Sequence, residues 1–343
     1  MKKTFLLTLV AAGICFGQGP SSQAVALTSK DAPAPSANAA TNERPGPPKD
    51  QMSNEQAGVN IDRFIGTAVN APVHLSHGTL LTHTILSGGN PYEAGAPGAV
   101  LEYRKQLATA TLLGMNRTPL STLPDEYFFY VQSGEGHIDD GKQSWPLRPG
   151  IAVLAAPNVP HRLVNTTEHP LNMIMLQWTA AGAPKNELVV RDVNLLNYCE
   201  ENAHWNNTSK CIFGAADGLF ASERIYLVML QPWTISQPHN HGRGTEEIWT
   251  KVTPGDATMM LGSELREMPQ NSAYLAPPTG FTNHANLNMS KDRVEWWLYV
   301  ARGPAQPNGA QNAGGRGRGG RGPANPNLNR DVQQATLPGT PLN

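Results

Sequence analysis

Three histidines and a carboxylate in the second half of the chain are spaced as the ligands of a metal ion would be. His239 and His241 are one residue apart, and side chains two positions apart on a β-strand point to the same face. Glu247 begins the next apolar stretch, and His284 lies further along the chain. Three imidazoles and one carboxylate suit a divalent transition metal and leave coordination positions open. The pattern predicts one bound ion, which we expect to be copper, iron, manganese or nickel, with zinc also possible.

Two neighbouring glutamates compete for the role of carboxylate ligand. We favour Glu247, because it stands directly before the predicted strand 248–252, and we keep Glu246 as the alternative. A carboxylate beside a bound ion could also move a proton, so both glutamates are candidate catalytic residues.

Three further residues are candidate contacts for a substrate. Arg243 lies between the histidine pair and the glutamates, where it could attract an anion, although a solvated loop side chain is our first expectation. Trp249 and Tyr274 are expected first as packing side chains, but aromatic rings that line an apolar pocket would also hold a ligand.

The same residues resemble the two signature motifs of the cupin superfamily, whose four ligands sit in a small β-barrel of jelly-roll type. The matching positions are His239, His241, Glu247, Pro278, Gly280, His284 and Asn288. Two departures are visible: five residues rather than three or four separate His241 from Glu247, and one extra residue precedes His284.

An internal duplication extends the resemblance to a two-barrel protein, or bicupin. Residues of a second motif set recur at a nearly constant offset, which indicates tandem copies of one barrel. The pairs 121 positions apart are Glu126 and Glu247, Gly134 and Gly255, and Pro157 and Pro278; those 123 apart are His161 and His284, and Asn165 and Asn288.

The two copies differ in their metal-binding residues. The same offset from the histidine pair leads to Thr118 and Leu120, neither of which can replace an imidazole. The first barrel therefore keeps only Glu126 and His161, and we expect it to bind no metal and to serve as a packing partner or a homodimer surface. The possible substitutes upstream, which we do not favour, are His74, His77 and His83.

Length and composition agree with an all-β fold of two tandem cupin barrels. The 343 residues accommodate two barrels of about 100 residues each, and the 33 glycines and 29 prolines suit many short strands and tight turns. We expect the first barrel at 61–178, a linker at 179–211 and the second barrel at 212–301. A net charge of −1 favours neither nucleic acid nor an acidic membrane as partner.

The ends of the chain are predicted to lie outside the barrels. Residues 1–26 have the basic start and the short apolar core of a signal peptide, too short to span a membrane, and they predict a periplasmic or secreted protein. The residues before Cys15 match a lipoprotein signal poorly. We expect a flexible lead-in at 27–60 and a disordered Gly/Arg/Pro-rich tail at 302–343.

Two cysteines remain in the chain after the predicted signal. In an oxidising compartment, Cys199 and Cys211 predict a disulfide within the linker, with two inert thiols as the alternative. Their spacing is not that of a zinc motif or a redox pair.

The resemblance to cupins implies a small-molecule substrate and leaves three functions open. The first is a metal-dependent oxidoreductase of dioxygenase type that acts on a small oxygenated organic compound. The second is a metal-dependent isomerase, epimerase or lyase of sugars or oxo-acids. The third is a non-catalytic barrel that binds a small ligand. All three stay open because one fold hosts many chemistries.

Overall fold

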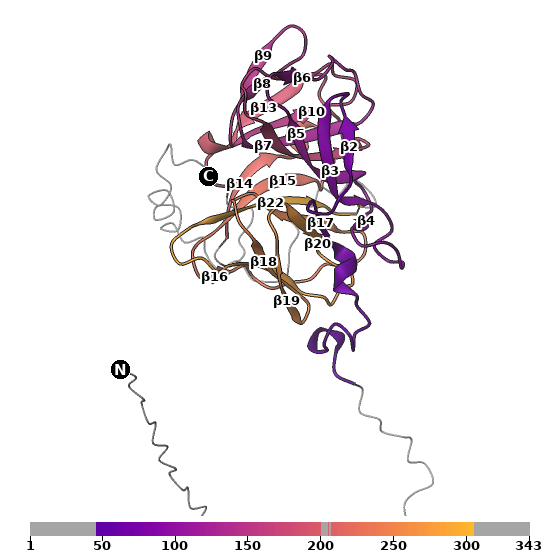
Figure 1. Ribbon diagram of the computed structural model, residues 1–343. Helices are drawn as coiled ribbons and strands as arrows, with labels where there is room; N and C mark the ends of the chain where they lie inside the picture. Colours follow the sequence, from indigo (N-terminus) through magenta and orange to yellow (C-terminus); the bar gives the residue numbers. More distant parts are fainter. Residues whose placement is uncertain (1–45, 200–204, 206, 305–343) are drawn as a thin grey trace, which may run out of the picture. The chain divides into compact units, whose positions relative to one another are not determined.

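The computed structural model describes residues 46–199, 205 and 207–304, which form β-strands and short 3-10 turns (Figure 1). Within this described part, the helical elements are η1 (Lys49–Gln51), η2 (Ile61–Phe64), η3 (Val193–Leu195) and η4 (Ala215–Asp217). The predicted all-β class is confirmed. The predicted signal peptide at 1–26 and the tail from 305 onward lie outside the described residues.

The first barrel consists of two facing sheets. The larger sheet has the strand order β13-β10-β7-β12-β5-β3-β2, with β4 added parallel to β3, and the smaller sheet has the order β6-β11-β8-β9. The strands are β2 (Val73–Ser76), β3 (Leu80–Gly88), β4 (Ala99–Leu101), β5 (Gln106–Leu112), β6 (Asn116–Arg117), β7 (Glu126–Ser133), β8 (Gly136–Asp139), β9 (Ser144–Leu147), β10 (Ile151–Ala155), β11 (Arg162–Asn165), β12 (Leu171–Trp178) and β13 (Leu188–Asp192).

The second barrel repeats this plan. Its larger sheet has the order β1-β20-β17-β22-β15-β14, and its smaller sheet has the order β16-β21-β18-β19. The strands are β1 (Ile65–Thr67), β14 (Asn207–Phe213), β15 (Arg224–Leu230), β16 (Thr234–Ile235), β17 (Glu246–Lys251), β18 (Ala257–Leu261), β19 (Glu264–Met268), β20 (Ser272–Leu275), β21 (His284–Asn288) and β22 (Glu295–Arg302).

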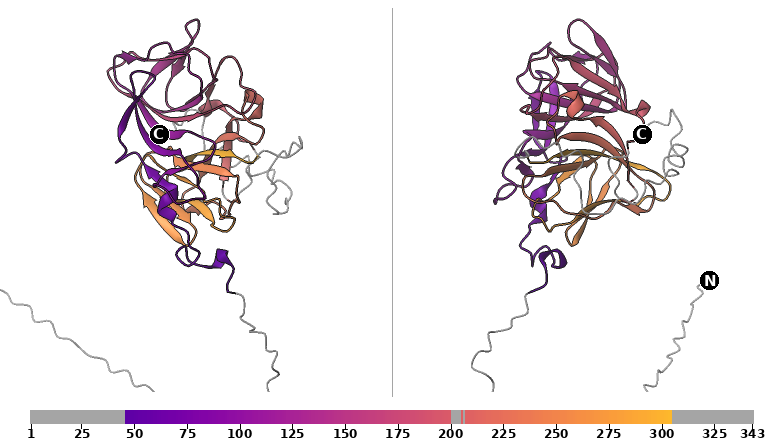
Figure 2. Two further views of the ribbon diagram at one scale, coloured as in Figure 1. Left: turned by 90° about the vertical axis from the view of Figure 1, so that its right-hand side faces the viewer. Right: turned by 180° about the vertical axis from the view of Figure 1, so that it is seen from behind.

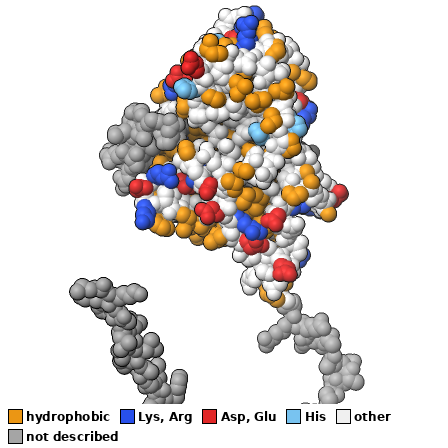
Figure 3. Space-filling model, in the orientation of Figure 1, with side chains coloured by type: hydrophobic (Ala, Val, Ile, Leu, Met, Phe, Trp, Pro, Cys, Tyr) orange, Lys and Arg blue, Asp and Glu red, His pale blue; other side chains and the backbone are white. Residues whose placement is uncertain are grey.

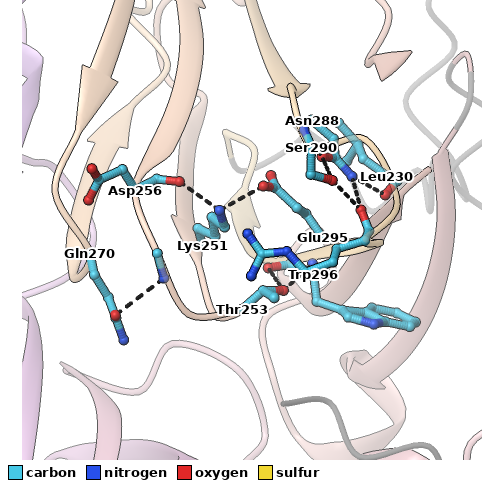
Figure 4. A network of polar contacts seen from close by, with 11 residues as sticks. Leu230, Lys251, Thr253, Asp256, Gln270, Asn288, Ser290, Glu295 and Trp296 are labelled. Atoms are coloured by element: carbon cyan, nitrogen blue, oxygen red, sulfur yellow. Dashed lines mark hydrogen bonds and ion pairs between the residues drawn. The ribbon is translucent and has the colours of Figure 1, made fainter. Parts of the chain in front are cut away.

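Equivalent asparagines at the ends of β11 and β21 support the duplication. Asn288 donates a hydrogen bond from its amide to the carbonyl of Leu230 at the end of β15 (3.0 Å; Figure 4). It also donates to the carbonyl of Arg293 (2.7 Å), which closes the turn between β21 and β22. Asn165 makes the corresponding bond to the carbonyl of His169 (2.7 Å). Both side chains are buried, so the repeated position has a structural reason: it satisfies backbone groups that water cannot reach.

Strand β1 and the residues just before it, which we expected to begin the first barrel at 61, pack on the second barrel instead. Strand β1 pairs with β20, and Ile61 and Ile65 lie in the interior cluster of the second barrel. Further upstream, the buried Asn54 donates to the carbonyl of Leu261 (3.0 Å) at the end of β18. We expected 27–60 to be flexible; residues 27–45 lie outside the described part, whereas the described portion around Asn54 is fixed to this barrel.

The expected linker also contributes strands to both barrels. Strand β13 extends the larger sheet of the first barrel through β10, and β14 extends that of the second through β15. Cys199 and Cys211 form a disulfide, as predicted. The disulfide thus joins the stretch that follows β13 to strand β14.

A shared hydrophobic core lies between the two larger sheets, and both barrels belong to the compact unit that begins at Pro47. Phe128 and Trp178 from the first barrel share one cluster with Ile248 and Leu298 from the second. Figure 2 shows the strands of one barrel stacked on those of the other. Side chains one position along these strands, such as Trp249, point into the barrel interior instead. Each larger sheet is therefore apolar on both faces, as continuous runs such as β7 require.

Charged side chains of both signs are interspersed on the face shown in Figure 3. That face therefore has no strong field of one sign, in agreement with a formal net charge of −1 for the chain. Within the described residues, no helix has the length and apolar character needed to cross a membrane.

Removal of the disulfide should destabilise the protein. The bond joins residues 12 positions apart, and a loop of this size contributes about 3 kcal/mol to the free energy of unfolding on the chain-entropy model. We expect the Cys199→Ser/Cys211→Ser variant to unfold at lower urea concentration, measured by tryptophan fluorescence. The reductant TCEP should shift the wild type in the same way and leave the variant unchanged. A wild-type transition insensitive to reductant would contradict this expectation.

Candidate metal centre

Four side chains from three segments of the second barrel converge on one point. His239 and His241 follow β16, Glu247 lies on β17, and His284 opens β21; their ligand atoms all lie within 4.8 Å of one another. The backbones of His239 and His284 are joined by two hydrogen bonds of 3.3 and 2.8 Å, which hold the two segments side by side. This cluster could hold a metal ion.

Glu247 lies at the centre of the cluster. Its Oε2 is 2.8 Å from Nε2 of His241, and its Oε1 is 2.8 Å from Nε2 of His284. Trp249 donates its indole N–H to Oε1 (2.7 Å), and the Tyr299 hydroxyl lies 3.4 Å from Oε2. Both carboxylate oxygens are therefore oriented by groups of the barrel interior.

The protonation states of Glu247 and His284 suit metal ligands. Burial alone would raise the pKa of Glu247, but the adjacent His241 and His284 hold it well below its ordinary value, so the carboxylate is ionised. Burial lowers the pKa of His284 to about 4, which keeps this imidazole neutral. For His241, burial acts to lower the pKa, yet the charge and contact of Glu247 leave it raised.

The donor set fits a transition-metal ion on geometric grounds as well. Nε2 of His241 and Nε2 of His284 each lie 2.8 Å from a different oxygen of Glu247, so the donor atoms of these three residues could contact one ion. His239 donates Nδ1–H to the carbonyl of Gln237 (2.9 Å), which assigns the lone pair to Nε2, as in many metal-binding histidines.

Exposure shows from which side the cluster can be reached. The side chain of His241 is 23% exposed, whereas those of Glu247 and His284 are 3% and 2% exposed. Trp249 and Tyr274 are buried behind the ligands, and the Tyr274 ring lies 6.1 Å from that of His284. A small molecule would therefore approach past His241, while the two aromatic candidates close the inner side.

The candidate anion contact lies at the junction with the first barrel. Arg243 is exposed, and its guanidinium lies 4.0 Å from the centre of the Tyr92 ring. The two residues border an open depression whose other lining residues are Gly89, Asn90, Pro91, Glu102 and Gly244.

Glu246 lies on the opposite face of β17 from the cluster. Its Oε1 accepts a bond from Arg104 (2.5 Å), and its Oε2 accepts one from the backbone N–H of Tyr103 (2.8 Å). Adjacent residues on a strand point to opposite faces, so the two glutamates cannot share one site. The structure thus brings Glu247, and not Glu246, to the three histidines.

The structural register corrects the pairing of glutamates between the two barrels. Tyr127 points into the first barrel, where its ring lies 4.7 Å from that of His77, as Glu247 points into the second. Glu126 instead faces the inter-barrel contact near Arg104 and Glu223, so it corresponds to Glu246. The predicted pairing of Glu126 with Glu247, at an offset of 121 positions, was thus wrong by one residue. The first barrel has the aromatic side chain of Tyr127 where the second barrel has the carboxylate of Glu247.

One upstream histidine enters the first barrel. Nε2 of His77 lies 3.1 Å from Nε2 of His161, and Ser76 bonds to Nδ1 of His77 (2.7 Å). His74 is exposed on β2, and His83 bonds to a loop carbonyl instead. Burial, followed by the charge of His161, lowers the pKa of His77 to about 3, so the pair is neutral.

The first-barrel pair lacks a complete ligand set. The backbone of Ser121 forms an isolated β-bridge with His161, as that of His239 does with His284. A serine therefore stands where the second barrel has its first histidine. Among the described residues, the only cluster of three or more potential ligands is the one in the second barrel. No local pattern in the sequence predicts the contact between His77 and His161, because the two residues are 84 positions apart and meet only in the folded barrel.

Comparisons with known proteins agree with this architecture. Residues 118–177, in the first barrel, match the family model described as a cupin domain. The chain is similar in structure to AerE from Microcystis aeruginosa (14% identity, TM-score 0.53, 70% of this chain and 99% of that chain). It is also similar to a deletion mutant of Bacillus subtilis oxalate decarboxylase (9%, 0.51, 75% and 82%) and to hazelnut vicilin from Corylus avellana (8%, 0.50, 70% and 85%). A sequence search of curated proteins finds no match.

Neutralising Glu126 should stabilise the protein above pH 7. Burial, followed by the charge of Glu223, raises the pKa of Glu126 from 4.5 to about 7. Below pH 4.5 Glu126 is protonated in both the folded and the unfolded chain. Between pH 4.5 and 7 it ionises only in the unfolded chain, so the free energy of unfolding falls as the pH rises. Above pH 7 it is ionised in both, and the loss of folding stability is complete. We expect Glu126→Gln to remove a loss of about 3 kcal/mol, measured by urea unfolding at pH 5 and pH 8.

The exposed Glu135, replaced by Gln, is the matched control for the loss of one carboxylate from the same barrel. It should keep the pH dependence of the wild type. An equal effect of Glu126→Gln at both pH values would show that ionisation of Glu126 does not limit stability.

Proposed function

The chain belongs to the cupin superfamily and has two barrels, and on that basis we propose that its second barrel binds one divalent transition-metal ion. The proposed ligands are His239, His241, Glu247 and His284. The observation that carries the proposal is the convergence of their donor atoms within 4.8 Å around an ionised, buried carboxylate. A buried carboxylate without a cation is costly, and an ion offsets that cost.

We further propose that the protein is a metal-dependent oxidoreductase of dioxygenase type for a small oxygenated organic substrate. Four protein donors leave positions open on the ion, and the partly exposed His241 marks the side from which a substrate enters. The bound ion would supply Lewis-acid and redox chemistry. Trp249 and Tyr299 would keep the carboxylate of Glu247 oriented, and the buried wall that includes Tyr274 would exclude water from the inner side.

Glu247 is also the proposed proton acceptor. Its carboxylate is ionised but is a weak base at so low a pKa, so it would take a proton only from a substrate hydroxyl that the bound ion had made more acidic. Glu246 has no part in this proposal, because its carboxylate is bound by Arg104 on the other face of the strand. Arg243, exposed on the loop between His241 and Glu247, is a proposed contact for an anionic substrate.

A lyase or isomerase is the second candidate. The name oxalate decarboxylase, carried by one structural neighbour, denotes a reaction of this class on a small acid. At 9% identity the likeness shows the fold alone, so this candidate serves as the alternative outcome of the activity test.

We also propose that the protein is exported. The disulfide between Cys199 and Cys211 is of the kind that forms in an oxidising compartment, and the predicted signal at 1–26 would direct the chain there. Copper is our first candidate ion, because it has the highest intrinsic affinity for such donors.

The metal site predicts the metal content of the purified protein. We expect about one equivalent of a transition metal in the wild type and its loss in the His239→Ala/His241→Ala variant, because two remaining donors rarely hold such an ion. Elemental analysis checks this, with His74→Ala, an exposed histidine of β2, as the matched control that should keep the metal. A metal-free wild type, or zinc that survives the double substitution, would refute the site.

The oxidoreductase proposal predicts oxygen consumption. With diketones, flavonols and phenolics as probes, we expect at least one to be lost together with dissolved oxygen, measured with an oxygen electrode. Glu247→Gln should reduce this rate at least about 100-fold, because it removes a charged ligand and the proposed proton acceptor. Solvent deuterium incorporated into a sugar or oxo-acid without oxygen uptake would favour the isomerase or lyase instead. Full function with zinc alone would favour a binding protein.

A further inference from the structure

The segment between two proposed ligands is held by the other barrel. We call residues 242–246, between His241 and Glu247, the ligand loop, and residues 89–104 of the first barrel the clamp segment. Gly244 donates its backbone N–H to the hydroxyl of Tyr92 (2.6 Å), and Tyr103 donates its hydroxyl to the carbonyl of Gly244 (2.9 Å). One residue of the ligand loop is thus bonded on both its donor and its acceptor side.

The end of the ligand loop is held by a buried ion pair. Arg104 lies 2.5 Å from Glu246 and 2.7 Å from Glu223, with side chains that are at most 1% exposed. The backbone N–H of Tyr103 bonds to the other oxygen of Glu246 (2.8 Å). Bonds to a buried charge are stronger than neutral ones, and loss of one partner is costly. The position of Glu246 is therefore strongly determined.

The clamp segment is itself fastened. The guanidinium of Arg63, which is buried, donates to the carbonyls of Asn90 (2.7 Å), Ala96 (2.8 Å) and Ala99 (3.3 Å). Gly89 lies so close to Ala99 that a Cβ atom there would be 2.1 Å from the Ala99 carbonyl oxygen. These contacts fix the backbone from which the two tyrosines and Arg104 reach the ligand loop.

The orientation of Glu247 follows from that of Glu246. The two residues are adjacent on β17, so fixing one carboxylate on the outer face fixes the direction of the next toward the interior. The five-residue spacing between His241 and Glu247 also has a reason here. Gly244, in the left-handed region with φ of +81°, presents its amide and its carbonyl to the two tyrosines.

We propose that Tyr92, Tyr103 and Arg104 of the first barrel are positioning residues for the metal site of the second barrel. They are not among the four proposed ligands, and they act by holding the ligand loop and thereby Glu247. The inference rests on the proposed metal site, and it assigns a role to a barrel that lacks a complete ligand set of its own among the described residues.

The experiment compares Tyr92→Phe, Tyr103→Phe and the double variant with a matched control. Each substitution removes one hydroxyl and keeps the ring, so the apolar packing is preserved. Thr111→Val is the control, because it removes a hydroxyl bond of the same barrel (2.8 Å to Asn172) that does not touch the ligand loop. Thermal melts followed by circular dichroism verify that all variants are folded.

The first readout uses Cu²⁺ as the probe. Loss of groups that orient metal ligands typically costs 10- to 100-fold in affinity, so we expect the double variant to bind Cu²⁺ roughly 10-fold more weakly in chelator competition. Its electron paramagnetic resonance spectrum should change, whereas Thr111→Val should match the wild type in both respects. Unchanged affinity and an unchanged spectrum in the double variant would overturn the proposal.

The second readout does not depend on metal. Hydrogen–deuterium exchange of peptides that cover 242–247 should be faster in the double variant, because the Gly244 amide loses its acceptor, and unchanged in Thr111→Val. If the wild type binds no metal, the proposed function fails, and this exchange alone decides whether the first barrel holds the loop. Exchange equal to that of the wild type would then reject the clamp independently.

Discussion

Along β17, neighbouring side chains point to opposite faces, and the proposed site and the inter-barrel contact both depend on that alternation. Glu246 and Ile248 face the first barrel, one in a buried ion pair and the other in the shared apolar core. Glu247 and Trp249 face the interior, where the indole N–H holds the carboxylate. A shift of one residue in this strand would exchange the two sets: in one direction Ile248 would take the place of Glu247 at the cluster, and in the other Glu247 would enter the apolar core. The many contacts on both faces therefore specify a single register.

The two barrels share one fold but bury different polar side chains in their interiors. In the second barrel, a charged carboxylate lies among three imidazoles, an arrangement that suits a cation. In the first barrel, Tyr127 occupies the corresponding place, and His77 and His161 form a neutral pair. Because Nδ1 of His161 donates to the carbonyl of Val159, its Nε2 accepts the proton of His77, and the pair needs no ion to satisfy its polar atoms. The difference follows from a few side chains.

The local pattern of apolar and turn residues was enough to predict much of the second barrel. The predictions that failed have physical causes. The strand expected at 248–252 agrees with β17 (Glu246–Lys251) to within two residues, because an apolar run marks it. The pairing of β1 with β20 could not be predicted, since it joins segments about 200 residues apart without a local signal. For Glu126, a one-residue error in the internal alignment changed the face of the strand, and only the observed register could reveal it.

The buried charges between the barrels are better explained by positioning than by stability. Glu126, Glu223 and Glu246 surround one arginine, Arg104, and all four side chains are buried. Such clusters contribute little net stability, because desolvation offsets the attraction, and apolar replacements of similar size are often at least as stable. Burial, followed by the charge of Glu223, raises the pKa of Glu126 to about 7, so a third negative charge in this cluster is costly. The cluster does, however, fix the backbone immediately before Glu247 through directional bonds that apolar contacts cannot supply. This geometric demand of the proposed ligand Glu247 accounts for charged groups within an otherwise apolar interface.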